Sequence, residues 1–121
     1  MSSRVTSLVI IGAVLVLFVA VGGFLIFRSQ GGGGTPRTFD VTVTNASTMT
    51  PDHLSARAGD RVTINIRSDR EGEVHLHGYD IAFDTKPGEV ASHTFTANQT
   101  GDFEIEWEST TTHLGDLAVN P

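Results

Sequence analysis

The chain has 121 residues, no cysteine, and 14 acidic against 8 basic side chains, which gives a formal net charge of −6 at pH 7. This length suffices for one small domain beside a short terminal segment, and it excludes a two-domain protein or a multi-span transporter. The absence of cysteine excludes disulfides and any site that needs a thiolate as ligand or nucleophile.

The N-terminal part of the chain is apolar. Residues 8–27 form a run of 20 residues without a charged or strongly polar side chain, flanked by Arg4 and Arg28. As an α-helix, this run is about 30 Å long, which matches the hydrocarbon thickness of a bilayer. We therefore predict a single transmembrane signal-anchor in residues 1–28, with a cleaved secretory signal as the alternative. The α-amino group adds positive charge before the run, so the positive-inside rule predicts a cytoplasmic N-terminus and an extracytoplasmic domain, periplasmic or on the cell surface.

A glycine-rich segment follows the apolar run. Residues 29–37 include four consecutive glycines at positions 31–34, and such a stretch behaves as a flexible coil. The predicted domain then comprises residues 38–121. Beyond residue 34 the chain carries 6 basic and 14 acidic residues. Because an anionic domain repels phosphate backbones, we expect no nucleic-acid partner.

The rest of the sequence has the period of β-strands. Apolar and polar side chains alternate in residues 39–43, 62–66, 103–107 and 117–119, and residues 89–97 form a longer candidate. This alternation is typical of strands with one face in a core and the other in water. Gly-Asp and Pro-Gly pairs separate the strands as turn signals. We predict an all-β fold of six to eight short strands in an antiparallel sandwich or barrel.

The sequence gives little support for an enzyme. It contains no phosphate-binding glycine motif and no nucleophile elbow. The row formed by Glu104, Glu106 and Glu108 has the parity of an outward, solvated sheet face, so we do not expect it to supply general acids.

The order of the turn and strand phrases resembles the cupredoxin family. Residues 59–64 are similar to its Gly-Asp-x-Val-x-hydrophobic strand, and residues 113–119 are similar to its Met-x-Gly-x-Leu-x-Val ending. Residues 87–90, 95–97 and 100–103 resemble phrases from the copper domain of cytochrome oxidase subunit II. The resemblance implies a cupredoxin-like Greek-key β-sandwich, preceded here by the single N-terminal transmembrane helix.

The chain departs from the family at the copper ligands. By the resemblance, the family's cysteine position falls on Trp107, and His113 stands where the family has its weak axial methionine. Residues 108–112 contain no histidine at the family's second imidazole position. The resemblance therefore implies no type 1 blue-copper centre, and we expect Trp107 to fill the core instead.

Three histidines remain as candidate metal ligands. His75 and His77 share one strand face because they are two residues apart, with side chains roughly 7 Å from each other. The resemblance places His75 beside the C-terminal loop, where His113 would complete a set of three imidazoles at one end of the sandwich. Such a set suits Cu(II) or Zn(II), with water, Asp80 or Met49 as a further ligand. The alternative interpretation is an ordinary polar sheet face.

The other candidate ligands favour structural roles. His93 has the same parity as the inward Phe95, which predicts partial burial, and His53 beside Pro51 is most simply a surface loop residue. Met49 is expected to cap the core. Asp80 is also a candidate to fix the tautomer of a nearby histidine.

We therefore expect a membrane-anchored extracytoplasmic cupredoxin-like domain that binds copper or another divalent metal through His75, His77 and His113. Its partners would be the membrane, a membrane protein, or a donor or acceptor of the metal. The alternative is a degenerate, metal-free cupredoxin that serves as a structural or protein-interaction module.

Overall fold

The computed structural model describes residues 34–121. The predicted anchor in residues 1–28 lies outside the described residues. Within the described part, no helix has the length and apolar character that crossing a membrane requires. Within residues 34–121 the first strand begins at Pro36, inside the segment 29–37 that the sequence suggests as a linker.

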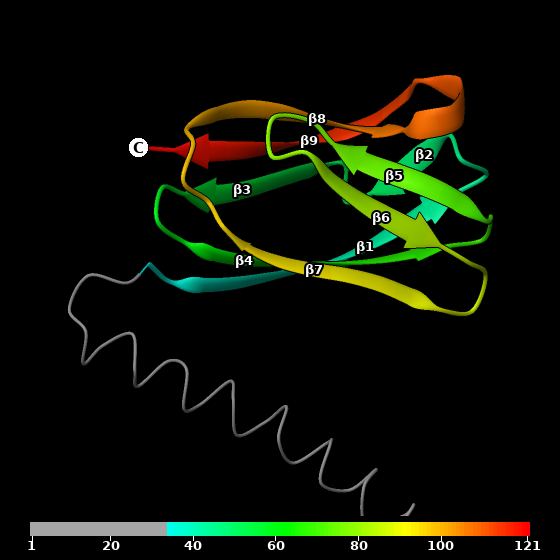
Figure 1. The fold of residues 1–121 in the computed structure, drawn as a ribbon, viewed down its shortest axis with the longest axis horizontal. Helices are drawn as coiled ribbons and strands as arrows, with labels where there is room; N and C mark the ends of the chain where they lie inside the picture. The colour runs from blue at the N-terminus through cyan, green and yellow to red at the C-terminus, as the bar shows by residue number, and fades with distance from the viewer. Residues whose placement is uncertain (1–33) are drawn as a thin grey trace, which may run out of the picture. The chain divides into compact units, whose positions relative to one another are not determined.

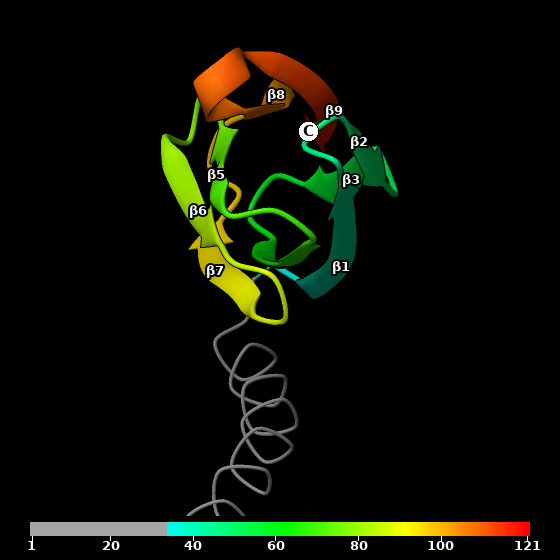
Figure 2. The same cartoon turned by 90° about the vertical axis from the view of Figure 1, so that its right-hand side faces the viewer.

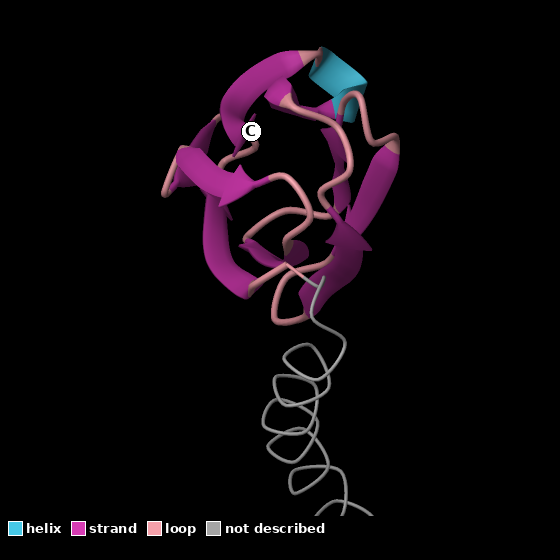
Figure 3. Cartoon of the chain, turned by 90° about the vertical axis from the view of Figure 1, so that its left-hand side faces the viewer, coloured by secondary structure: helices cyan, strands magenta, loops and turns pink. Residues whose placement is uncertain are grey.

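The described chain folds into strands and one short helix, as Figure 1 shows. The strands are β1 (Pro36–Thr44), β2 (Thr48–Thr50), β3 (His53–Arg57), β4 (Arg61–Ser68), β5 (Gly72–Leu76), β6 (Ile81–Thr85), β7 (Val90–Thr96), β8 (Gly101–Trp107) and β9 (Thr112–Asn120). The 3₁₀-helix η1 (Glu108–Thr110) connects β8 to β9 at one end of the domain (Figure 3). The predicted all-β class is confirmed.

Two sheets face each other to form a sandwich (Figure 2). One has the strand order β2-β1-β4-β7, and the other has the order β3-β9-β8-β5-β6. The expectation of a purely antiparallel arrangement was wrong for two pairs, because β1 runs parallel to β4 and β3 runs parallel to β9. A parallel pair needs a crossover connection. For β1 and β4 the crossover is β3, which belongs to the five-stranded sheet, whereas β2 before it and β4 after it belong to the four-stranded sheet.

The space between the sheets is filled by the inward side chains of both. The expected alternation holds in β4, where Val62, Ile64 and Ile66 are all buried. Trp107 and Met49 also lie in the core, with 4% and 5% of their surface exposed. The prediction that Trp107 fills the core is therefore confirmed, and Met49 has the packing role that we expected for it.

The turn between β5 and β6 is fixed by aromatic contacts. The Tyr79 ring packs against Phe103 and Phe95 at centroid distances of 4.8 and 5.0 Å. Its hydroxyl donates a hydrogen bond of 2.7 Å to the carbonyl oxygen of Gln99. Gly78 has a φ of +82° and no room for a β-carbon, which would overlap the Phe103 ring. These contacts hold the segment that carries His77 and Asp80.

Candidate metal centre

Four of the five histidines lie on the outer face of the five-stranded sheet or at its edge. Alternation places His75 there, because its neighbours Val74 and Leu76 are fully buried on the inner face. His77 follows β5 with the same parity, while His53 and His113 come from β3 and β9. Each of the four ring systems has a carboxylate partner within 3.0 Å.

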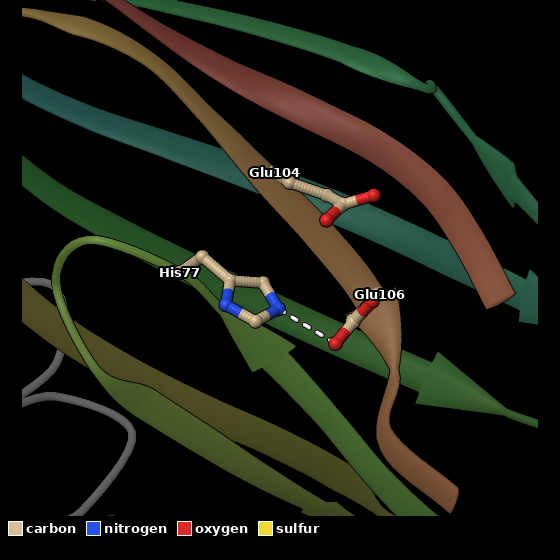
Figure 4. A group of neighbouring side chains, drawn as sticks. All are labelled: His77, Glu104 and Glu106. Atoms are coloured by element: carbon tan, nitrogen blue, oxygen red, sulfur yellow. Dashed lines mark hydrogen bonds and ion pairs between the residues drawn. The ribbon is translucent and has the colours of Figure 1, made fainter. Parts of the chain in front are cut away.

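The shortest of these contacts joins His77 to Glu106. Nε2 of His77 lies 2.7 Å from Oε1 of Glu106, whose side chain is only 12% exposed (Figure 4). The backbone N–H of His77 donates to the carbonyl oxygen of Glu104 on the adjacent strand β8, at 2.9 Å. Three potential ligand atoms lie within 4.8 Å of one another, one each from His77, Glu104 and Glu106. These three side chains form what we call the outer-face triad.

A β-bulge brings His113 to the triad. In the pairing of β8 with β9, Ile105 lies opposite Gly115 and Glu106 lies opposite His113, so Leu114 is the extra residue. Both Leu114 and Gly115 are buried. The bulge shifts the parity of β9, and His113 consequently lies on the outer face, where its Nδ1 is 2.9 Å from Oε2 of Glu104.

His75 lies beside the triad. Its ring packs edge-to-face against His77, with centroids 4.5 Å apart and planes at 80°. Its Nε2 is 3.0 Å from Oδ1 of Asp80, which is the contact expected from a carboxylate that fixes a histidine tautomer. Its side chain is 18% exposed, less than that of any other histidine on this face.

The structure thus brings the three predicted histidines to one face but not into one set of imidazoles. His75 and His77 are in ring contact, whereas His113 is connected to them through Glu104. The expectation that Glu106 belongs to a solvated row was wrong, because cross-strand packing leaves it largely buried against His77. The shared parity of the glutamates and histidines was the signal that could have identified Glu104 and Glu106.

The remaining candidate residues lie apart from this group. His93 is exposed rather than partly buried, and its ring packs against Phe83 at 5.0 Å. His53 begins β3 and its Nδ1 is 3.0 Å from Oδ1 of Asp116. This hydrogen bond, together with the negative charge of Asp116, raises the pKa of His53 above its ordinary value.

The donor atoms of the triad determine which metals suit it. Imidazole nitrogen and carboxylate oxygen are ligands for Zn(II) and Cu(II), whereas Cu(I) prefers sulfur. The chain has no cysteine, so the residues present do not fit a type 1 copper centre, and they do fit a divalent ion held by nitrogen and oxygen. The partial exposure of Glu104 and His113, 45% and 65% of their side chains, leaves the group open to solvent.

Comparisons with known proteins identify the fold. No protein-family model and no curated protein matches the sequence. Among solved structures, the chain is similar to an apo copper-binding protein determined by NMR, with a TM-score of 0.59 and 15% identity over 74% of this chain and 99% of that one. The fold is cupredoxin-like.

Two further structures share this cupredoxin-like fold. The metal-binding domain of the Cu(I)-exporting P-type ATPase of Streptococcus pneumoniae, determined with Cu(I), matches with a TM-score of 0.61 and 13% identity over 74% of this chain and 98% of that domain. A laccase from Botrytis aclada matches with a TM-score of 0.59 and 19% identity over 74% of this chain, which spans 23% of the laccase. At these identities the likeness shows the fold alone.

Proposed function

We propose that the chain is a membrane-anchored extracytoplasmic cupredoxin-like domain that binds Cu(II), or another divalent metal, on the outer face of its five-stranded sheet. The observation that carries this proposal is the convergence of His77, Glu104 and Glu106 within 4.8 Å. His113 supports it, because its contact with Glu104 adds an imidazole next to the triad. A copper-binding protein among the structural neighbours supports copper as the metal.

The residues of the outer-face triad suggest that the chain binds a metal ion without catalysing a reaction. Glu106 would hold the metal from the buried side, and His77 and Glu104 would hold it from the exposed side. A bound cupric ion supplies a positive charge that two neighbouring carboxylates stabilise. Because the group is open to solvent, a donor or acceptor protein has access to the ion. We therefore propose storage or transfer of the metal rather than electron transfer or an enzymatic reaction.

The proposed location depends on residues 8–27, whose length and apolarity suit one bilayer span. With the N-terminus in the cytoplasm, the domain would lie outside it. This orientation can be tested with two reporters fused in turn to the C-terminus, one that is active only inside the cytoplasm and one that is active only outside it. We expect activity of the second reporter, and activity of the cytoplasmic reporter alone would contradict the orientation.

Copper titration of the detergent-solubilised full chain tests the metal site. We expect a tetragonal Cu(II) electron paramagnetic resonance signal with nitrogen hyperfine splitting. We expect His77→Ala and Glu106→Gln to weaken Cu(II) binding roughly tenfold or more, the scale typical of losing a metal ligand or its immediate partner. His93→Ala and Glu89→Gln are matched controls, because both residues are exposed and neither belongs to the five-stranded sheet.

The outcome also distinguishes the alternative function. If the wild-type chain leaves copper in its aqueous form, or if the triad variants bind it like the controls, the metal site is refuted. A metal-independent complex with a membrane protein would then favour the structural or protein-interaction module.

A further inference from the structure

The second feature of the outer face is the environment of the His75 ring. Its backbone is held between two neighbouring strands, with Ala82 of β6 opposite on one side and Glu106 of β8 opposite on the other. Nε2 of His75 lies 3.0 Å from a carboxylate oxygen of Asp80. An ionised carboxylate only accepts hydrogen bonds, so Nε2 carries the proton. In the neutral ring Nδ1 then bears the lone pair.

Among the described residues, no donor forms a hydrogen bond to this lone pair. Nδ1 of His75 is buried, and no hydrogen bond reaches it from within residues 34–121. Most buried side-chain nitrogen atoms in proteins are hydrogen-bonded, and an exception calls for an explanation such as an ion. The other ring nitrogen is bonded to a carboxylate, which is the usual arrangement of a metal-ligating histidine.

The carboxylate of Glu108 lies beside this nitrogen. Its Oε2 lies 3.7 Å from Nδ1 of His75, and the side chain is 49% exposed. This distance exceeds the roughly 3.2 Å limit of a nitrogen–oxygen hydrogen bond. It matches the separation of two ligands that share one ion, since atoms about 2.0–2.2 Å from a zinc or copper ion lie about 3–4 Å apart.

We infer that Nδ1 of His75 and the Glu108 carboxylate form a second site for a divalent metal ion, with solvent as the remaining ligands. The site is distinct from the outer-face triad because it shares no side chain with it. The ring contact between His75 and His77 places the two sites next to each other. The full chain therefore binds two divalent ions, one on each side of that contact.

The stoichiometry of Zn(II) binding tests the second site. Purified full chain is titrated with zinc chloride in a calorimeter, and bound zinc is measured by elemental analysis after gel filtration. We expect two ions per chain for the wild type and for the controls His93→Ala and Glu89→Gln. We expect one ion for Glu108→Gln and His75→Ala, and one ion for His77→Ala. Glu108→Gln keeps the size of an exposed side chain, so it tests the site without disturbing the fold.

The possible results separate the two sites. One ion in the wild type that persists in Glu108→Gln and disappears in His77→Ala refutes the second site and leaves the triad. One ion that disappears in Glu108→Gln and persists in His77→Ala refutes the triad and supports the second site. No bound ion in the wild type refutes both.

Discussion

The indole of Trp107 lies directly against Gly72, where a β-carbon would overlap the six-membered ring. The two residues belong to adjacent strands, since β5 pairs with β8 and Val74 lies opposite Trp107. The smallest side chain in β5 therefore makes room for the largest one in β8. This contact fills the inner face of the sheet at the end of β8, and the helix η1 begins at the next residue, Glu108.

Substitution of Gly72 by alanine should destabilise the domain. The added methyl group must displace a buried ring, and overpacking of this kind costs about 1–3 kcal/mol. Urea unfolding followed by Trp107 fluorescence measures the change in the free energy of unfolding. In a Trp107→Phe background, followed by circular dichroism, the same substitution should cost less, because the smaller ring leaves space. Equal costs in both backgrounds would contradict the contact.

Asp60 should stabilise the turn that precedes β4. Its side chain is 4% exposed, and Oδ2 accepts hydrogen bonds from Nε of Arg37 at 2.8 Å and from the backbone N–H of Arg57 at 2.9 Å. Asp60→Ala leaves a backbone donor without this acceptor, and we expect a loss of about 1–3 kcal/mol in unfolding free energy.

Arg37→Ala is the matched control for Asp60. The Arg37 side chain is 43% exposed, and its removal leaves the Asp60 carboxylate with the backbone N–H of Arg57 as a donor. Thermal or urea unfolding of both variants should therefore show the larger loss for Asp60→Ala. Equal losses for the two variants would show that the ion pair, rather than the backbone contact, stabilises the turn.

Metal affinity should fall as the pH decreases. Nε2 of His77 is engaged with Glu106 and Nδ1 of His113 is engaged with Glu104, and a metal must displace any proton in these contacts. Protonated imidazole cannot bind a metal, so protons compete with the ion. Calorimetry at pH 5.0 and pH 7.5 should show tighter Cu(II) binding at the higher pH. Affinity independent of pH would exclude imidazole ligands.

His53 provides a pH-dependent contribution to stability. The hydrogen bond and charge of Asp116 raise the pKa of His53. A raised pKa in the folded state means that the stabilisation is fully present below the ordinary histidine pKa and is lost as the pH rises through the raised value. Replacement of Asp116 by asparagine should return the His53 pKa, measured by proton NMR, toward its ordinary value.

The unfolding free energy of the same variant provides an independent check. The difference between the wild type and Asp116→Asn should be larger at pH 5.5 than at pH 8.5. Ser55→Ala is a suitable control, because it alters an exposed side chain of β3, the strand that carries His53, without changing its charge. A difference that grows with pH would contradict the assigned direction.

Much of the fold could be predicted from the sequence. Alternation in residues 62–66 and 103–107 identified strands whose inward residues are buried, including Trp107. The short strands β2, β3 and β6 were not identified, because three to five residues give too little pattern. The parallel pairing of β1 with β4 was also missed, because local periodicity does not determine which strands become neighbours.

For the candidate site, the sequence by itself determined the type of chemistry. It fixed the absence of a thiolate, the shared face of His75 and His77, and the parity of the glutamates in β8. These properties follow from the amino-acid composition and from the two-residue period of a strand. Composition and strand period do not depend on contacts between residues far apart in the chain.

Only the tertiary structure decided which carboxylate each histidine meets. The bulge at Leu114 turns His113 outward, and the register of β8 with its neighbours brings Glu104 and Glu106 to His113 and His77. A shift of one residue in register reverses the face of every side chain in a strand. Pairing between segments far apart in the chain sets that register, and no local pattern encodes it.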